Sequence, residues 1–241
     1  MRAMPVLSAN HSIDTSAHIA RIRPIVQNII FAIERSRLKG TAFAVISNNC
    51  WGYEIYRALR VPYNSPFVGL FLFPGCYIRL LEEFETCVKS NLRFADQSKY
   101  IGGSVNYPIG FLCNEVEIHF LHYSSKEQAS EKWKRRMVRL RKAMEADKPF
   151  FVKFCDRDGC TAEHIAKFHS LPFPNKLSIG IGPFNAAGHL YQPRMKDPTG
   201  PFVLDGLKLY EKRYHYFDIS YWLSKGIVCR TLLSRIFALM S

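Results

Sequence analysis

Residues 41–59 read TAFAVISNNCWGYEIYRAL, and this stretch decides how the chain folds. It begins with an apolar, partly β-branched run at 42–46, which is typical of a buried strand. The run ends at the polar turn SNNCWG, after which Ile55 and Leu59 recur at helical spacing. Folds of the α/β class use a strand, a polar turn and a helix to place functional groups at the carboxyl end of a strand. The stretch therefore predicts an α/β fold with a candidate site at this turn.

A second stretch repeats this order of elements. The sequence predicts a buried strand at 150–154, the polar turn CDRDGCT at 155–161, a helix at 162–169 and a further strand at 176–181. The matching second strand of the first stretch is expected at 67–73. We therefore predict an α/β protein of two similar β-α-β subdomains, arising by duplication, with helices covering the sheets. Both polar turns are expected on one side of the molecule, where they frame a common cleft.

The predicted elements divide the chain into four segments. Residues 1–40 form a leader and an N-terminal helix, 41–123 the first α/β half, 124–226 the second half, and 227–241 an apolar and basic C-terminal helix. That last helix can dock on the body, pair with another subunit, or contact a membrane surface peripherally. Docking is the preferred expectation, and the pattern leaves the oligomeric state open.

The composition is that of a folded protein with a large positive charge. Hydrophobic residues make up 48% of the chain and charged residues 22%, which excludes a disordered chain. The formal net charge of +13 permits nucleic acid, an anionic membrane surface or a phosphate-bearing substrate as a partner. Because the sequence contains no nucleic-acid-binding motif, nucleic acid is disfavoured.

The cysteines and the apolar segments predict a cytoplasmic protein. The seven cysteines are an odd number and include no Cys-x-x-Cys pair, so we expect reduced thiols. The amino terminus lacks the apolar segment of a secretory signal. No apolar run approaches the ~20 residues that are needed to span a bilayer.

The first polar turn offers hydrogen-bonding groups just before a helix. Free backbone N–H groups at a helix N-terminus can bind an anion such as a phosphate, although simple helix capping is the alternative. Cys50 at this position can have a lowered pKa and act as a nucleophile, but a buried structural thiol is the preferred expectation. The predicted substrate-binding residues of this turn are Ser47, Asn48, Asn49 and Trp51.

The second polar turn contains two carboxylates, Asp156 and Asp158, directly after a strand. Two carboxylates this close become useful when a divalent cation, Mn or Mg, bridges them to a diphosphate. Metal-dependent glycosyltransferases place an Asp-x-Asp motif in this way. The alternative is a turn or cap role, which the same pattern also serves. Both residues are therefore candidate metal ligands and candidate catalytic residues.

The stretch 115–123 predicts a strand that carries two histidines. His119 and His122 are three apart, so they point to opposite faces and only one of them can enter a given pocket. His122, at the carboxyl end of the strand, is the candidate catalytic base.

A long basic helix is expected from about 124 to 146, with its apolar stripe toward the core. The candidate anion-binding residues on this helix are Arg135, Arg136 and Arg139, because arginine binds phosphate through two parallel N–H bonds. A solvated helix face is the alternative.

Four of these motifs together resemble a bacterial family of unknown function, whose members are often described as exopolysaccharide or capsular polysaccharide biosynthesis proteins. The motifs are ISNNCWGYEIYRAL, YNSPFVGLF, EIHFLHYSSKEQASEKWKRR and DRDGCTAEHIAKFHSLPFPNK, in this order from about 41 to 179. The resemblance implies an α/β fold of two similar subdomains and a role in surface polysaccharide assembly. It supplies no reaction, so no catalytic residue is carried over.

Three functions are consistent with these observations. The first is a cytoplasmic transferase that uses a nucleotide-activated sugar or another anionic sugar substrate. The second is an acyltransferase that acts on a sugar through Cys50, with His122 as base. The third is a non-catalytic protein that binds a polysaccharide precursor or a partner enzyme.

Overall fold

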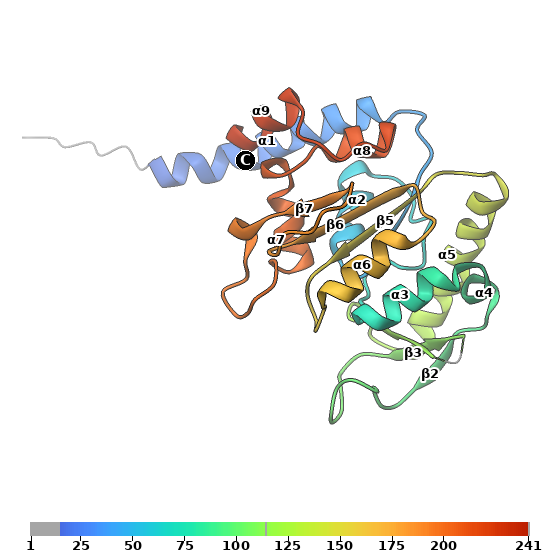
Figure 1. Cartoon of the computed structure of the whole chain (residues 1–241). Helices are drawn as coiled ribbons and strands as arrows, with labels where there is room; N and C mark the ends of the chain where they lie inside the picture. The colour runs from blue at the N-terminus through green and yellow to red at the C-terminus, as the bar shows by residue number, and fades with distance from the viewer. Residues whose placement is uncertain (1–14, 114, 241) are drawn as a thin grey trace, which may run out of the picture.

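The computed structural model describes residues 15–113 and 115–240, so the predicted leader at 1–14 lies outside the described residues. Two sheets and the helices packed around them form a mixed α/β fold (Figure 1). The predicted α/β class is therefore confirmed.

The larger sheet is parallel, with strand order β1-β5-β6-β7. Its strands are β1 (Ala44–Ser47), β5 (Phe150–Cys155), β6 (Asn175–Gly180) and β7 (His189–Tyr191). Helices cover both faces, which is why β1 and β5 are almost continuously apolar. One face is covered by α3 (Pro74–Glu82) and α6 (Ala162–Ser170), and the other by α2 (Trp51–Leu59), α7 (Gly206–Glu211) and α8 (Ile219–Lys225) (Figure 1).

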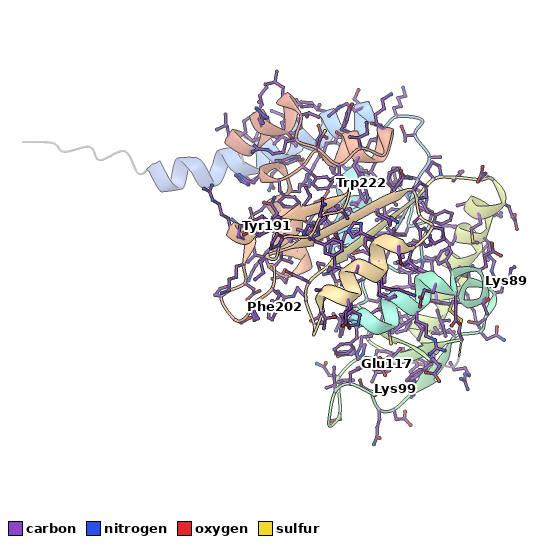
Figure 2. The ribbon with its side chains drawn as sticks, viewed as in Figure 1. Lys89, Lys99, Glu117, Tyr191, Phe202 and Trp222 are labelled. Carbon is purple, nitrogen blue, oxygen red and sulfur yellow. A yellow bond between two sulfur atoms is a disulfide. The ribbon has the colours of Figure 1, made fainter. Side chains whose placement is uncertain are left out.

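The smaller sheet is antiparallel and consists of β2 (Arg93–Ala95), β3 (Ile109–Leu112) and β4 (Val116–His119). Gly110 is required at its centre, because an added Cβ would lie 2.7 Å from Leu92 and 2.8 Å from Phe120. The Lys99 backbone N–H donates to the buried Glu117 carboxylate at 2.8 Å, and Figure 2 shows the two residues together at this end of the molecule. The remaining short elements are α4 (Phe84–Lys89), η1 (Pro193–Met195) and η2 (Arg213–His215).

The predicted duplication is not shown. The first strands of the two expected halves, β1 and β5, are direct neighbours in one sheet. In the described residues the segment 67–73, expected as a strand, contributes only an isolated bridge between Phe71 and His119. Gly69 has a φ of 73°, which interrupts the extended run. The Leu72 N–H donates to the Asn48 carbonyl at 2.9 Å, so this segment links the two sheets and belongs to neither.

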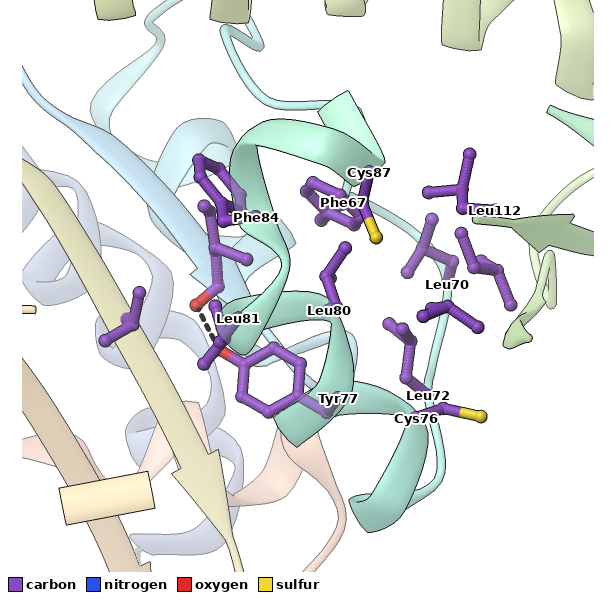
Figure 3. Packing of buried hydrophobic residues seen from close by; sticks show 14 of the residues in the cluster. Phe67, Leu70, Leu72, Cys76, Tyr77, Leu80, Leu81, Phe84, Cys87 and Leu112 are labelled. Atoms are coloured by element: carbon purple, nitrogen blue, oxygen red, sulfur yellow. Dashed lines mark hydrogen bonds between the residues drawn. The ribbon is translucent and has the colours of Figure 1, made fainter. Parts of the chain in front are cut away.

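One hydrophobic core lies between the parallel sheet and α3 (Figure 3). Tyr77 is fully buried, and its hydroxyl donates to the Ile46 carbonyl at 2.9 Å, beside the end of β1. Full burial of one large apolar side chain contributes about 1.5–3 kcal/mol, so this core holds β1 firmly in place. The polar turn that follows β1 is therefore presented by a rigid strand.

The basic helix is present as α5 (Lys126–Glu145). Ser125 caps it, with its side chain accepting from the Gln128 N–H at 3.2 Å. Trp133, Met137 and Leu140 are buried, so the predicted apolar stripe is confirmed. Because this stripe faces the core, the basic residues of α5 occupy its other sides.

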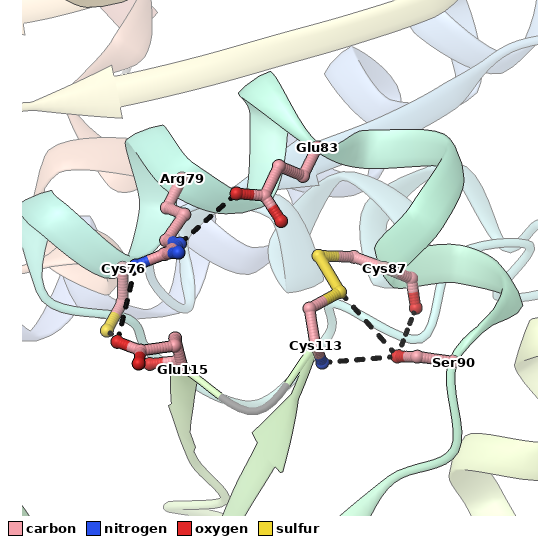
Figure 4. Close-up of a disulfide and its surroundings, with 7 residues drawn as sticks. All are labelled: Cys76, Arg79, Glu83, Cys87, Ser90, Cys113 and Glu115. Atoms are coloured by element: carbon pink, nitrogen blue, oxygen red, sulfur yellow. Dashed lines mark hydrogen bonds and ion pairs between the residues drawn. A yellow bond between two sulfur atoms is a disulfide. The ribbon is translucent and has the colours of Figure 1, made fainter.

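Two cysteines form a disulfide, so the prediction of seven reduced thiols is wrong for this pair. Cys87 of α4 is bonded to Cys113 at the end of β3, and their Cα atoms are 5.3 Å apart (Figure 4). The helices α3 and α4 meet at Glu83, and α4 brings Cys87 to the small sheet. Because the two cysteines are 26 residues apart in the sequence, a local sequence pattern cannot predict this contact.

The C-terminal helix α9 (Leu232–Met240) docks on the body, as expected. Phe237 packs against Tyr214 and against Ile30 of α1 (Thr15–Arg37). Trp222 of α8 lies in the interior between this region and the sheet (Figure 2). Across the described residues, none of the helices combines the length and the apolar character that crossing a membrane requires.

Candidate functional site

Both polar turns line one large pocket. β1 and β5 are parallel neighbours with Ser47 opposite Lys153, so the turns that follow them leave the sheet at the same edge. Asn49 and Cys50 of the first turn and Arg157 and Asp158 of the second line a pocket of about 910 Å³. The expectation of a common cleft on one side of the molecule is thus confirmed. Its volume matches that of a site for a substrate larger than a simple metabolite.

A thiol and an imidazole meet in this pocket. Cys50 Sγ lies 3.2 Å from His122 Nε2, and both side chains line the pocket. Cys50 directly precedes α2, whereas His122 follows β4 and its backbone N–H donates to the Gly69 carbonyl at 3.3 Å. The segment 67–73 therefore positions the histidine beside the end of β1. His119, by contrast, is fully buried, with Nε2 2.8 Å from Glu117. Because β4 ends at His119, the expected strand does not extend to His122, which lies in the turn that follows.

The Cys50 thiol is protonated at neutral pH. Burial, together with the Glu54 and Asp205 carboxylates, raises its pKa to about 11, and Lys153 opposes them. The predicted lowering of this pKa is therefore wrong, because burial and the two carboxylates outweigh the effects that lower it. Cys50 is partly buried and lines the pocket, so it is not the fully buried thiol that was expected, whereas a structural role stays a prediction. Such a thiol needs a base to become a nucleophile. His122 Nε2 lies within hydrogen-bond distance of Sγ and can serve as that base.

Most of the other residues of the first turn are buried and hold the turn in place. Asn49 reaches the pocket, whereas Ser47, Asn48 and Trp51 are fully buried and do not line it. Asn49 Oδ1 accepts from the Trp51 N–H at 3.2 Å and from Lys153 Nζ at 3.1 Å. Its Nδ2 donates to Cys155 Sγ at 3.2 Å. The turn is thus fixed against β5, and of the predicted substrate-binding residues here only Asn49 is placed to touch a ligand.

The two carboxylates of the second turn have different surroundings. Asp156 accepts from the backbone N–H of Ile181 at 2.6 Å and of Val203 at 2.8 Å, and it borders a separate cavity of about 240 Å³. Asp158 lines the large pocket, and its backbone has a φ of 61°, which is uncommon outside glycine. Burial raises the pKa of the Asp158 carboxyl. Both oxygens of Asp156 are engaged, so the arrangement gives no support to a shared Mn or Mg site.

Within the part of the chain that the structure describes, the one cluster of three potential metal ligands consists of Glu83, Cys87 and Cys113 and does not include the Asp-x-Asp turn. Two of those three residues are the disulfide-bonded cysteines. This cluster therefore offers no free thiolate ligands while the disulfide is intact.

One side of the pocket is basic. Lys132, Arg135 and Arg136 of α5 line it, whereas Arg139 does not and instead donates to the Tyr63 carbonyl at 3.0 Å. Arg136 is buried and donates to the Val68 carbonyl at 3.1 Å and to the Tyr123 hydroxyl at 2.6 Å. The structure therefore brings two of the three predicted arginines into the site.

Several site residues were missed in the sequence. Lys153 was read only as part of a buried strand, although a charged residue in the middle of FFVKFC is a signal that this strand contains a polar network. Lys132 lies on the same basic helix as the three predicted arginines, and its position one turn before them is a signal that it shares their face. Tyr53, Glu54 and Tyr63 also line the pocket; they lie inside the quoted motifs but were not predicted as site residues. Asp205 comes from a segment without any motif.

Residues 21–223 match the model of a domain of unknown function, DUF1919. The chain belongs to this family. It is also similar to an uncharacterized protein of Haemophilus influenzae, with 37% identity over 155 residues, which is 64% of this chain and 69% of the relative. The resemblance to a family of unknown function is confirmed, whereas neither description mentions a polysaccharide.

Proposed function

We propose that this member of the DUF1919 family is an acyltransferase that uses Cys50 as nucleophile and His122 as general base, with a sugar hydroxyl as the acceptor. The observation that supports the proposal is the 3.2 Å distance between Cys50 Sγ and His122 Nε2 inside the large pocket. A nucleophile and a base within hydrogen-bond distance are the shared feature of enzymes that form a covalent acyl intermediate.

The first half-reaction transfers an acyl group from a thioester to the enzyme. His122 Nε2 takes the thiol proton while Cys50 Sγ attacks the carbonyl carbon. The bond between this carbon and Sγ forms, the bond to the donor sulfur breaks, and the donor leaves as a thiol with the proton from the imidazolium. The product of this step is a thioester on Cys50.

The second half-reaction passes the acyl group to the sugar. Nε2 takes the proton of the acceptor hydroxyl, and the hydroxyl oxygen attacks the acyl carbon. The bond to Sγ breaks, and Sγ recovers a proton from the imidazolium. One thioester and one alcohol are converted to one ester and one thiol, so no oxidant or reductant is needed.

The raised pKa of Cys50 makes the base essential to this mechanism. With a pKa of about 11, roughly one thiol in ten thousand is ionised at pH 7 in the absence of assistance. Proton transfer to His122 during the attack removes this limitation, because the thiolate then forms only as it is consumed. General-base assistance of this kind contributes about 10²–10⁴-fold to a rate.

Other residues of the pocket suit a sugar acceptor. Asp158 offers a carboxylate that accepts hydrogen bonds from hydroxyl groups. Tyr53 and Tyr63 stack with ring centroids 5.8 Å apart and form an aromatic wall. Such a combination of aromatic surface and a few polar groups is typical of pockets that orient a small molecule. A precursor of a surface polysaccharide is the acceptor that we propose.

Transfer from a nucleotide-activated sugar is the second candidate. The basic side of the pocket favours it, because a leaving diphosphate requires positive charge. Its metal-dependent form is disfavoured, since the backbone N–H groups of Ile181 and Val203 already engage both oxygens of Asp156. This candidate also assigns no role to the contact between Cys50 and His122.

The test is formation of the acyl-enzyme. The protein is mixed with acetyl-coenzyme A or with the neutral thioester S-acetyl-N-acetylcysteamine, without an acceptor, and intact mass and peptide mapping locate the acetyl group. We expect acetylation at Cys50, none at that position in Cys50→Ala, and a rate about 100-fold lower in His122→Gln.

Cys160→Ala is the matched control, because Cys160 is also a partly buried free cysteine but borders the smaller cavity. It should be acetylated as fast as the unmodified sequence. Acetylation that persists in Cys50→Ala, or a correctly folded protein that neither thioester modifies, would contradict the proposal. In that second outcome a non-catalytic binding role becomes the better explanation.

A further inference from the structure

The basic side of the pocket has a definite composition. It consists of Lys132, Arg135 and Arg136, which stand at spacings of three and four along α5 and therefore share one face of the helix. We call these three residues the basic wall. None of the catalytic steps proposed above uses them, so their presence in the same pocket as Cys50 requires a separate explanation.

Carboxylates do not neutralise the basic wall. In the described part of the chain neither Lys132 nor Arg136 has a carboxylate at ion-pair distance, and Lys132 Nζ instead lies 5.1 Å from the centre of the Tyr123 ring. Arg135 Nη1 lies 3.9 Å from Glu131, in an exposed and therefore weak pair. The wall thus retains its positive charge toward the pocket.

Arg136 is the most informative member. Its side chain is 8% exposed, and the guanidinium stacks on the Tyr63 ring with 4.7 Å between Cζ and the ring centre. Both of its hydrogen bonds go to neutral oxygens, on Val68 and Tyr123, and both leave from Nη1. Burying a cation without an anion is unfavourable, and an anionic ligand in the pocket would compensate this charge.

Three carboxylates line the pocket, Glu54, Asp158 and Asp205. They come from elements other than α5, and two of them are partly occupied. Glu54 of α2 accepts from Arg57 Nε at 2.9 Å. Asp205 caps α7 by accepting from the Lys208 N–H at 3.0 Å. Positive charge is therefore concentrated on the α5 side, and a ligand with an anionic end and a neutral reacting end would enter in one orientation.

We infer that the basic wall binds the phosphate or diphosphate group of the substrate. The inference rests on the proposed function in one respect, namely that the reacting end of that substrate lies at Cys50. Arginine forms paired N–H bonds with phosphate oxygens, and lysine adds a mobile point charge. A pocket of about 910 Å³ holds a ligand as large as a nucleotide or coenzyme A. Either source, a coenzyme A thioester or a nucleotide sugar, carries the required phosphate chemistry.

Binding is measured by calorimetry on Cys50→Ala, which prevents any acyl transfer during the titration. The probes are inorganic pyrophosphate, coenzyme A and a uridine diphosphate sugar. Lys132→Met with Arg135→Met removes two charges from the wall and spares Arg136, which also holds Val68. The matched control is Lys134→Met with Lys142→Met, which removes two exposed charges of the same helix outside the pocket.

We expect binding of pyrophosphate and of one organic phosphate, about tenfold or more weakened in the wall variant and nearly unchanged in the control. Tighter binding of coenzyme A assigns the phosphate to the acyl donor, and tighter binding of the nucleotide sugar assigns it to the sugar substrate. Equal weakening in both double variants, or no binding of any phosphate probe, overturns the inference.

Acetylation of Cys50 by neutral S-acetyl-N-acetylcysteamine separates the two proposals. If this thioester modifies Cys50 while no phosphate probe binds, the proposed function stands and the basic wall has no role in phosphate binding. If phosphate probes bind but neither thioester modifies Cys50, the wall is a phosphate site and the acyltransferase proposal fails.

Discussion

The two polar turns stand side by side at one edge of the sheet, yet they contribute to the pocket in opposite ways. The turn after β1 presents Asn49 and Cys50 to the pocket and buries Ser47, Asn48 and Trp51 as support. In the turn after β5 the first carboxylate, Asp156, accepts from backbone N–H groups, whereas Arg157 and Asp158 line the pocket. The comparison teaches that a turn at the carboxyl end of a strand in this sheet lies beside the pocket. Contacts with distant elements then decide which side chain remains free.

One contact couples the two strands directly. Lys153 of β5 is fully buried, and its Nζ lies 3.1 Å from Asn49 Oδ1 in the other turn. Burial lowers the pKa of this lysine, and its Nζ donates to Oδ1 of Asn48 and of Asn49. A positive charge below the first turn favours any negative charge that develops at Cys50. The first turn therefore depends on the second strand for its electrostatics.

The largest effect is expected from two matched substitutions in the second turn. Asp156→Asn replaces one acceptor oxygen with an N–H group that faces a backbone N–H, so we expect a loss of about 2 kcal/mol in the free energy of unfolding. Asp158→Asn should change it by less than about 0.5 kcal/mol, because asparagine tolerates the left-handed backbone. Urea denaturation of both variants gives the comparison. Equal losses would mean that the two carboxylates do not differ as described.

The location of the site could be predicted from the sequence because each polar turn lies next to its own strand. A buried run followed by a polar turn is a local pattern, and Asn49, Cys50 and Asp158 were found through it. The roles within each turn could not be predicted, because they depend on residues far along the chain. The N–H groups that engage Asp156 belong to Ile181 and Val203.

The fold follows the same rule. β1, α5, β5, α6 and β6 were predicted to within about two residues at each end, since each has a complete local pattern. The failed strand at 67–73 is as apolar as β5, but Gly69 and the bridge to His119 give it another path. An apolar run predicts that a segment is buried. The segment becomes a strand only where neighbouring strands form hydrogen bonds with it. The disulfide of Cys87 with Cys113 escaped prediction because it too joins distant segments.

An intermediate effect is expected from Lys153→Met, which keeps the length of the side chain and removes its charge. Lys153 lowers the pKa of Cys50, so its loss should raise that pKa and reduce the thiolate fraction at a given pH. We expect alkylation of Cys50 by iodoacetamide at pH 9 to slow roughly threefold, since one pKa unit corresponds to about a tenfold change. Peptide mapping must follow Cys50 alone. An unchanged rate in the folded variant would remove Lys153 from the electrostatics of the site.

The smallest effect has the opposite sign and concerns Asp205. This carboxylate raises the pKa of Cys50, so Asp205→Asn should lower that pKa and increase the thiolate fraction below pH 11. Asparagine is also a good helix cap, so α7 should keep its N-terminus and the variant should stay folded.

Alkylation of Cys50 at pH 9 should accelerate roughly twofold in Asp205→Asn, because a carboxylate that is partly screened by water shifts a pKa by a fraction of a unit. Asp158→Asn is the control, since Asp158 lines the same pocket but is not among the charges that shift Cys50. Its rate should match that of the unmodified sequence. If both variants accelerate equally, the pocket acts on Cys50 through its total charge. The contrast between the two turns would then lie in their packing and not in their electrostatics.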